Sequence, residues 1–330
     1  MSIDSPGIIN ISIVIEWENV LLSEADRALE MLKQLSTQLQ DIHHAVEVLF
    51  LFNEEDIAAK TLQAIIDTHL TVHPSLANRV SVQLVPVVGL HYYDIKNAGV
   101  QQAKGDLVVF LDSDVIPEPH WLKALIEPFF NDASVQVIAG HTYLEPEGFL
   151  GRAFALGWFF PTKAIPDAKL TPASQFFANN VAFRRSVLLQ YPFEAMPKGV
   201  TRGACTELAK TLVQAGIPLL KTTQAQTSHP RPNGAHHIII RALAMGRDRF
   251  LRETAKGASG IQAFGDVLRY FKQAIGRLSR RVIHERQKVG ATRIEAPLIF
   301  LLMFSWQSLA LMGGALSFIA PNLAQRLWRI

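Results

Sequence analysis

Two carboxylates stand two residues apart at the end of an apolar run. The run is Leu107 to Leu111, and Asp112-Ser113-Asp114 follows it directly. Residues two apart on a strand point to the same face, and a turn at the strand end can bring both carboxylates toward one ion. Hard oxygen ligands of this kind suit Mg²⁺ or Mn²⁺. The pattern predicts a divalent-cation site; the alternative is a strand-end loop in which Asp114 caps a helix beginning near Pro117.

The elements that must position this motif alternate between short apolar runs and helix-period segments, as is typical of an α/β sheet with crossover helices. Because the runs are mostly apolar, we expect helices on both faces of the sheet. Such a sheet binds ligands beyond the carboxyl ends of its strands, where Asn53 and Asp112 lie. The expected strands are Ile11 to Ile15, Val46 to Phe52, Val80 to Val88 and Leu107 to Leu111, with a first crossover helix from Ser23 to Leu39.

The second half of the chain is less regular. From Phe149 to Pro172 we expect an irregular lobe, because aromatic residues crowd there and three prolines break any long element. A helix from Thr206 to Ala215 and a strand from Ile217 to Lys221 are expected after it. Ile238 to Phe271 contains amphipathic helical stretches with arginines on the polar side, a pattern suited to a membrane interface.

Charge is distributed unevenly along the chain. Residues 1–240 hold 17 Lys/Arg against 24 Asp/Glu, whereas residues 241–293 hold 13 against 4. A basic segment suits either nucleic acid or an anionic membrane. The uncharged run from Pro297 to Ile319 decides for the membrane, since as a helix of about 34 Å it can cross a bilayer core. A re-entrant helix and a buried core helix are the alternatives, and the basic flank places the acidic part in the cytoplasm.

Three motifs in a fixed order resemble family 2 of the inverting glycosyltransferases. They are Lys96-Asn97-Ala98-Gly99, then Ala103-Lys104-Gly105-Asp106, then Val108 to Asp114. In that family an Arg-Asn-x-Gly helix start, an Ala-x-Gly and a strand ending in Asp-x-Asp recur in this order. The resemblance covers roughly Ile11 to His229. It implies a GT-A fold, which is α/β and Rossmann-like with a mostly parallel sheet, and sugar transfer with inversion from a nucleotide diphosphate donor.

The resemblance also implies a metal cofactor, Mn²⁺ or Mg²⁺. Asp114 would ligate the ion, and Asp112 would contact either the ion or the ribose. His229 follows the last core strand, where a histidine often completes the ligand set in this family. His236 and His237 lie nearby in the sequence and compete with it.

Six residues are expected to bind the donor: Asp112, named above, and Glu16, Asn53, Glu54, Lys96 and Asn97. Lys96 replaces the arginine that the family places beside Asn97, and a cation there would neutralise the pyrophosphate; the alternative is a solvated lysine on a helix. Asn53 and Glu54 stand where the family presents an Asp to the nucleotide base. Glu16 departs from the usual sequence after the first strand and is expected to line the base pocket.

The acceptor side lacks the carboxylate pair with which the family begins its catalytic helix. Ala204-Cys205 stand in its place. Glu207 is the nearest acid and Cys205 the other catalytic candidate; their structural alternatives are a first-turn helix charge and a buried packing residue. A polyprenyl phosphate acceptor would already be anionic and need no strong base, and Asn180, Arg184 and Arg202 would bind it. A hydroxyl of a glycolipid or polysaccharide precursor is the rival acceptor.

We therefore expect a glycosyltransferase at the cytoplasmic face of the cell membrane. It would be non-processive, because the Gln-x-x-Arg-Trp motif of processive members is missing. The alternatives are a degenerate membrane protein that binds nucleotide sugar without turnover, and a sugar nucleotidylyltransferase. The expected organisation is a catalytic domain at 1–235 (donor half 1–115, acceptor half 116–235), a basic interfacial region at 236–295, a membrane helix at 296–320 and a tail at 321–330.

Overall fold

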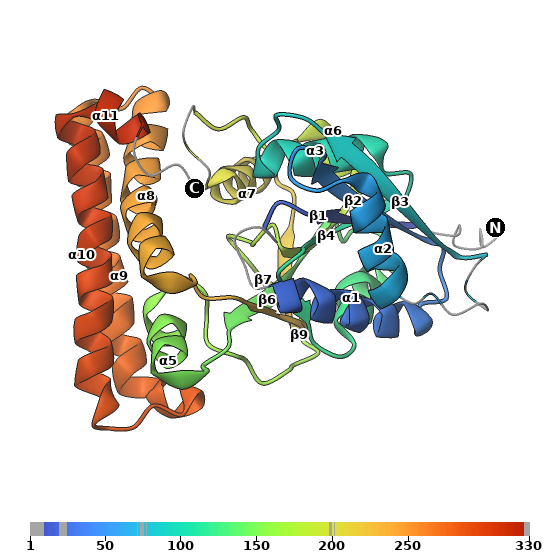
Figure 1. Ribbon diagram of the computed structural model, residues 1–330, viewed down its shortest axis with the longest axis horizontal. Coiled ribbons are helices and arrows are strands. Elements are labelled where there is room, and N and C mark those ends of the chain that lie inside the picture. Colours follow the sequence, from blue (N-terminus) through green and yellow to red (C-terminus); the bar gives the residue numbers. More distant parts are fainter. Residues whose placement is uncertain are drawn as a thin grey trace. The chain divides into compact units, whose positions relative to one another are not determined.

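The computed structural model describes residues 10–19, 25–70, 72, 76, 78–197, 200 and 202–326. The last four residues of the expected tail, 327–330, lie outside them. The chain divides into two compact units, both visible in Figure 1. Unit 1 comprises Met1–Thr142, Ile165–Glu194 and Cys205–His229, and unit 2 comprises Tyr143–Ala164, Ala195–Ala204 and Pro230–Ile330.

Unit 1 is built on a mixed sheet in the order β3-β2-β1-β4-β8-β6-β9-β5, with β7 paired to β9. β3, β2, β1 and β4 are parallel, and β8 continues the sheet antiparallel to β4. The strands are β1 (Ile11–Glu16), β2 (Val46–Asn53), β3 (Val80–Val87), β4 (Leu107–Asp112), β5 (Ile116–Pro117), β6 (Val137–Leu144), β7 (Thr171–Pro172), β8 (Asn180–Arg184) and β9 (Leu219–His229).

The parallel strands differ in burial. Every residue of β1 and of β4 is buried, as expected for strands covered on both faces. The same expectation was wrong for β3, in which only the two end residues, Val80 and Val87, are buried. β3 is the edge strand beside β2, so it has only one neighbour to cover it.

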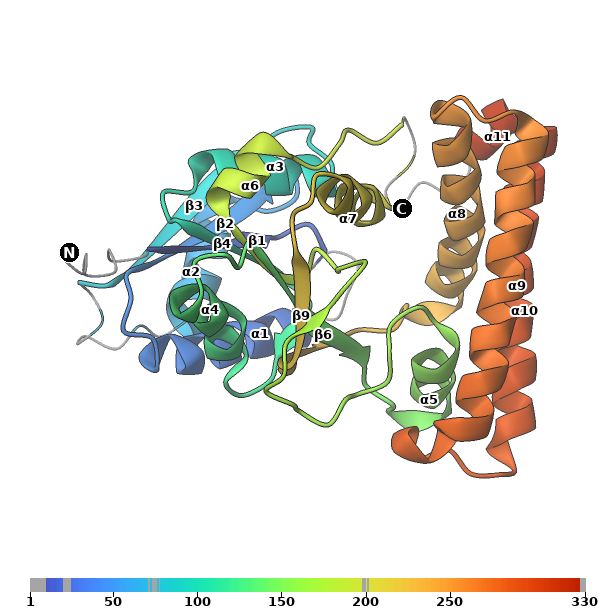
Figure 2. The same ribbon diagram turned by 180° about the vertical axis from the view of Figure 1, so that it is seen from behind.

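Helices cover both faces of this sheet. α3 and α6 lie on one face, and α1 and α4 lie on the other, as Figures 1 and 2 show. Two motif glycines allow close packing: a Cβ at Gly99 would come within 2.4 Å of the Val14 side chain, and one at Gly105 within 2.7 Å of the Ser12 backbone nitrogen. The helices of unit 1 are α1 (Ala25–Gln40), α2 (Ala59–His69), α3 (Tyr92–Gln102), α4 (Trp121–Asn131), α6 (Arg185–Gln190) and α7 (Ala204–Gln214).

Two sequence expectations about this half need correction. The helix expected near Pro117 begins at Trp121, with His120 at its N-cap, so Asp114 does not cap it. Pro117 instead belongs to β5, which pairs with Thr227 and Ser228 of β9. The strand expected at 217–221 is β9, which starts at Leu219 and continues to His229 because its polar residues pair with other strands.

Unit 2 is helical. It contains α5 (Gly148–Gly157), α8 (Gly234–Ala255), α9 (Gly260–His284), η3 (Arg286–Val289), α10 (Glu295–Ile319) and α11 (Pro321–Arg326). The expectation of an irregular lobe from Phe149 was wrong at its start, since α5 buries Phe154 and Leu156 before the prolines begin. α8, α9 and α10 lie side by side (Figures 1 and 2). Of the helices described, α10 is long and apolar enough to cross a membrane, although 39% of its most apolar window is buried.

Candidate functional site

Three carboxylates gather where β1 and β4 end. The two strands are paired so that Glu16 lies opposite Asp112. Glu16 is fully buried, and Asp112 and Asp114 are 2% and 5% exposed. β1 also pairs with β2 on its other side, so this edge is the point at which the strand order reverses. Ligands of open α/β sheets bind at such a point.

Asp112 is held by three donors. Lys96 Nζ lies 2.7 Å from its Oδ1, the Tyr92 hydroxyl lies 2.7 Å from its Oδ2, and Asn19 Nδ2 lies 3.4 Å from the same oxygen. The Lys96 side chain is fully buried, with its ammonium 4.7 Å from the centre of the Tyr92 ring. The solvated-lysine interpretation is therefore wrong. Lys96 is the counter-ion of Asp112, and both oxygens of Asp112 are engaged by the protein itself.

Glu16 accepts hydrogen bonds from the chain that follows β1. The backbone N–H groups of Glu18 and Asn19 donate to its Oε2, and the Asn19 side chain donates to its Oε1 at 2.7 Å. Burial raises the pKa of Glu16 well above its ordinary value, and Asp112 and Asp114 raise it further. Burial and Asp112 likewise raise the pKa of Tyr92. This edge carries more negative charge than its donors neutralise, so it favours a bound cation.

Arg27 ties the acidic loop to the end of β9. Its Nε donates to the Asp114 carbonyl at 3.0 Å, and its Nη2 donates to the carbonyl and hydroxyl of Ser228 at 2.9 and 3.0 Å. His229 is the next residue and ends β9. The predicted ligands Asp114 and His229 thus lie on segments joined by one side chain.

The described residues do not form a complete metal site. Among them, no group of three or more His, Cys, Asp or Glu side chains is arranged to hold an ion. The oxygen donors of this edge are nevertheless of the type that Mg²⁺ and Mn²⁺ prefer. Asp114 and His229 as ligands of such an ion stay a prediction.

The other predicted donor residues divide into two kinds. Asn53 ends β2 beside β1, and its side chain accepts from the Glu55 N–H at 3.1 Å, which leaves Glu54 exposed in the turn. These residues lie at the same edge of the sheet as Glu16. The side chain of Asn97 makes structural hydrogen bonds instead: its amide group donates one to the backbone of Phe193 and accepts one from it. We interpret Asn97 as a residue that holds the segment after α6 in place.

Asn180 is close to the acidic edge but is used for structure. It lies opposite Leu111 and is fully buried. Its Oδ1 accepts from Trp121 Nε1 at 2.8 Å, and its Nδ2 donates to Ala225 and Thr227. The side chain therefore joins β8, β9 and α4, which corrects the expectation that it contacts an acceptor.

Arg184 is at the wrong end of the sheet for the predicted role. It lies opposite Leu107, at the start of β4. Asp112 is five residue steps farther along the strand, or roughly 16 Å away. Its guanidinium donates to the carbonyls of Val135 and Phe129. This corrects the expectation that Arg184 binds an acceptor phosphate. Arg202 belongs to unit 2, where its carbonyl accepts from Arg252 at 3.3 Å.

The start of α7 offers no strong base. Cys205 is within hydrogen-bond distance of the Tyr93 hydroxyl, at 3.3 Å, and burial raises the pKa of its thiol. A protonated thiol at neutral pH favours the packing interpretation over a catalytic one. The Glu207 carboxylate is paired with Lys210, whose Nζ lies 3.3 Å from both of its oxygens.

Sequence reasoning missed three polar side chains of this site. Tyr92 stands one helical turn before Lys96, and Asn19 stands three residues after Glu16, so spacing alone could have identified both. Arg27 gave no local signal. Its partners Asp114 and Ser228 are 87 and 201 residues away in the sequence.

The comparison with protein families now bears on this geometry. Residues 94–191 match the family described as Glycosyl transferase family 2. The segment runs from the first turn of α3 through β4 and Asp112-Ser113-Asp114 to α6, so it contains Lys96 and its partner. The predicted resemblance is confirmed over this part of the chain.

One of the solved structures compared with this chain shows the same fold. A mannosyltransferase of Pyrobaculum calidifontis, in complex with GDP-Man and Mn²⁺, superposes with a TM-score of 0.55 at 12% identity, over 94% of this chain and 87% of that one. The predicted GT-A fold is thereby confirmed. A mycobacterial protein (TM-score 0.44, 16% identity, 72% of this chain and 73% of that one) and GalNAc-T7 with UDP, GalNAc and Mn²⁺ (0.44, 14%, 68% and 44%) are also similar. Among curated proteins, none matches the sequence.

Proposed function

We propose that this protein is a metal-dependent glycosyltransferase that moves a sugar from a nucleotide diphosphate donor to a membrane-associated acceptor. The observation that carries the proposal is the buried acidic edge of Glu16, Asp112 and Asp114, which includes the Asp-x-Asp of the family 2 segment. The mannosyltransferase that shares the fold is described as a complex with GDP-Man and Mn²⁺, which supports this choice of donor and ion.

The residues of the edge divide the work of donor binding. Asp114 and His229 would hold the divalent ion, which would supply positive charge to stabilise a departing diphosphate. Lys96 keeps Asp112 in place within a buried network, so that Asp112 can accept from the donor ribose. Asn53 and Glu54 contact the base at the end of β2. Inversion and a single transfer per encounter follow from the family resemblance and from the missing processive motif.

The acceptor is a polyprenyl phosphate in this proposal. The protonated Cys205 thiol and the Lys210-paired Glu207 leave the start of α7 without a strong base. An anionic phosphate oxygen needs none, whereas a sugar hydroxyl does. The basic segment of residues 241–293 and the apolar α10 support a lipid-linked acceptor, and a catalytic domain at the cytoplasmic face of a membrane.

Release of nucleoside diphosphate tests the enzymatic part. The full chain in lipid nanodiscs is incubated with Mn²⁺ and a panel of nucleotide sugars. We expect one donor to be turned over, and Asp114→Ala to lower that rate by about 100-fold or more because one metal ligand is lost. Asp41→Ala, an exposed aspartate after α1, is the matched control and should retain full activity. No release from any donor would contradict the proposal.

Acceptor identity is tested separately with the productive donor. Polyprenyl phosphate, a neutral glycolipid and a mixture without acceptor are compared by product analysis. Product on polyprenyl phosphate supports our choice. Product only on the neutral glycolipid would indicate that Glu207 is the general base. Glu207→Gln should then abolish product formation.

A second candidate function is binding of a nucleotide sugar without turnover. It is favoured by the same start of α7, where Ala204-Cys205 replace the family's carboxylates. Mn²⁺-dependent donor binding that is never followed by nucleoside diphosphate release, with any acceptor, would support it.

A further inference from the structure

The outer faces of α9 and α10 form one apolar surface. The two helices are antiparallel, since Phe264 stacks on Phe318 and Phe271 contacts Phe304, with ring centres 5.5 and 6.0 Å apart. Large apolar side chains are exposed along both helices. They include Ile261, Leu268 and Ile283 on α9, and Leu298, Leu301, Phe304, Met312, Leu316, Phe318 and Ile319 on α10. Soluble proteins rarely expose so long an apolar patch without a partner.

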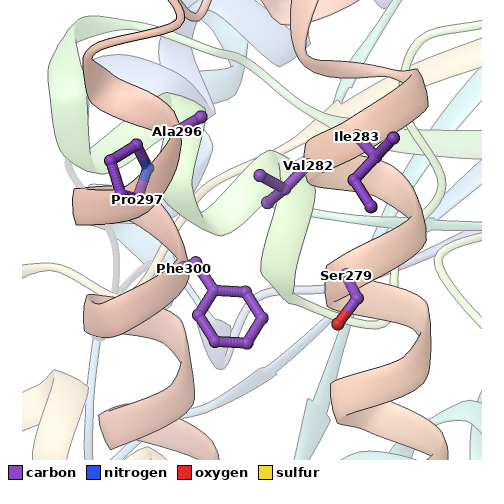
Figure 3. A pocket seen from close by; sticks show the side chains of 6 residues that line it. All are labelled: Ser279, Val282, Ile283, Ala296, Pro297 and Phe300. Atoms are coloured by element: carbon purple, nitrogen blue, oxygen red, sulfur yellow. The ribbon is translucent and has the colours of Figure 1, made fainter.

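A groove opens at one end of this surface. Figure 3 shows side chains of α9 and α10 facing each other across it, and the cavity volume is about 370 Å³. Five of its six lining residues are apolar, and the sixth is a serine. The lining residues are Ser279, Val282, Ile283, Ala296, Pro297 and Phe300. The groove can hold a hydrocarbon chain but offers almost no polar contact.

The opposite face of α10 is locked against α8. A Cβ at Gly246 would come within 1.7 Å of the Ala310 carbonyl oxygen, and one at Gly313 within 2.0 Å of the Leu243 carbonyl oxygen. Trp306 Nε1 also donates to the Ile238 carbonyl at 2.9 Å. Contacts at backbone distance leave no room for lipid between the helices. α10 therefore enters a membrane only together with its neighbours.

Those neighbours carry charges along their length. Arg269 in the middle of α9 is 70% exposed, and α8 contains the buried pair Arg247 and Asp248. From residue 256 to 324, a stretch described throughout, every exposed Lys, Arg, Asp or Glu is basic: Lys256, Arg269, Lys272, Arg280, Lys288 and Arg293. A charged side chain at the bilayer centre is unfavourable unless it is paired or reaches the headgroups. A bundle carried across the bilayer on α10 would bring several of them into hydrocarbon.

We propose that α10 does not cross the membrane, and that α9 and α10 together lie flat in the interface of an anionic bilayer. Their shared apolar surface enters the acyl region, and an acyl chain occupies the groove between Ile283 and Phe300. The long side chains of Arg269 and Lys272 reach back to the headgroups. Both ends of α10 then remain on the side of unit 1. This inference rests on the membrane association in the proposed function and defines its geometry.

Topology labelling tests the proposal. Single-cysteine variants are made in a Cys205→Ser background, at Ile294 before α10 and at Asn322 after it, both of which are exposed. An Asp41→Cys variant reports the side of unit 1. Intact cells and inverted membrane vesicles from a bacterial host are treated with a membrane-impermeant maleimide. We expect all three cysteines to be labelled in inverted vesicles and none in intact cells.

The other outcomes are distinct. Labelling of Ile294→Cys and Asn322→Cys from opposite sides would show that α10 crosses, and would overturn this inference while leaving the proposed transferase activity intact. Recovery of the active protein only in the soluble fraction would overturn both this inference and the membrane-associated acceptor.

Binding to vesicles supplies a second measure. The double variant Arg269→Gln with Lys272→Gln should weaken binding to phosphatidylglycerol vesicles roughly 30-fold, and binding to phosphatidylcholine vesicles much less.

Discussion

Two glutamates are buried in the same sheet at opposite ends of neighbouring strands, and their surroundings differ. Glu47, at the start of β2, accepts from the Ser12 hydroxyl and from the backbone N–H groups of Lys104 and Gly105. Glu16, at the end of β1, has a pKa that is raised by burial first and then by Asp112 and Asp114 beside it.

The difference separates a structural carboxylate from a functional one. Donors surround the charge of Glu47, so it stabilises the fold by joining β1, β2 and the turn after α3. Glu16 also accepts three hydrogen bonds, but two further carboxylates, Asp112 and Asp114, lie beside it, which is unfavourable in the protein alone. A fold retains such an arrangement where a ligand compensates for it. We infer that the carboxyl edge of the sheet binds a cation and that the opposite edge does not.

The largest effect on stability is expected at Lys96, which compensates the buried charge of Asp112. Lys96→Met leaves Asp112 buried without its ammonium partner, and should lower the free energy of unfolding by about 3 to 5 kcal/mol. Chemical denaturation of the metal-free protein measures the loss. Lys33→Met, which removes an exposed lysine, should change stability by less than about 0.5 kcal/mol.

A double variant sharpens this prediction. Adding Asp112→Asn to Lys96→Met removes the unpaired charge, so much of the stability should return while donor binding does not. An Asp112→Asn addition that restores no stability would contradict the assignment of Lys96 as its counter-ion.

At the opposite edge, Glu47→Ala should cost about 3 kcal/mol, because three donors lose their acceptor. Glu47→Gln retains the accepting oxygen and should cost much less. Denaturation measures stability, and donor binding of the folded fraction should be unchanged in both variants. Loss of donor affinity in Glu47→Gln would show that the two edges are not functionally distinct.

The raised pKa of Glu16 predicts that the stability of the metal-free protein depends on pH. Its pKa is higher in the folded than in the unfolded chain, so the folded state binds the proton more tightly and wild-type stability falls as pH rises above the unfolded value. Glu16→Gln is neutral at every pH and does not titrate. It should therefore be the more stable form at pH 8, by about 1.4 kcal/mol for each unit of difference between the folded and unfolded pKa of Glu16. The two proteins should converge toward pH 4. A constant difference across the range would contradict the raised pKa.

The smallest effect is expected at Cys205. Because burial raises the pKa of its thiol, alkylation of the folded protein by iodoacetamide should stay slow up to pH 9. Cys205→Ser should keep turnover within about twofold of wild type, since the residue packs and does not transfer protons. A loss of 100-fold or more would assign the thiol a catalytic role.

The parallel half of the fold could be predicted from the sequence because its signals are local. The apolar runs at β1, β2 and β4 and the glycines that allow close packing are each legible within a few residues. β3 was misjudged because burial on an edge strand depends on its neighbours. α5 was missed because three prolines farther along the lobe outweighed a short helical segment.

The site was predictable in part for the same reason. Asp112 and Asp114 were found by spacing, and Lys96 by its place in the motif. Whether Lys96 was solvated or buried depended on packing against Tyr92 and Phe110, which no local pattern encodes. Arg184 was wrongly assigned to the acceptor. The sequence does not show that β8 runs antiparallel to β4, which places Arg184 at the end of the sheet away from Asp112.

Calorimetric titration of the productive nucleotide sugar tests the central claim most directly. Wild type, Asp114→Ala and Glu47→Gln are compared with Mn²⁺ and with a chelator. We predict that wild type and Glu47→Gln bind equally well with Mn²⁺ and poorly with the chelator. Asp114→Ala should bind about 100-fold more weakly than wild type with Mn²⁺ and no more weakly than wild type with the chelator. Equal affinity of Asp114→Ala and wild type in the presence of Mn²⁺ would contradict the account.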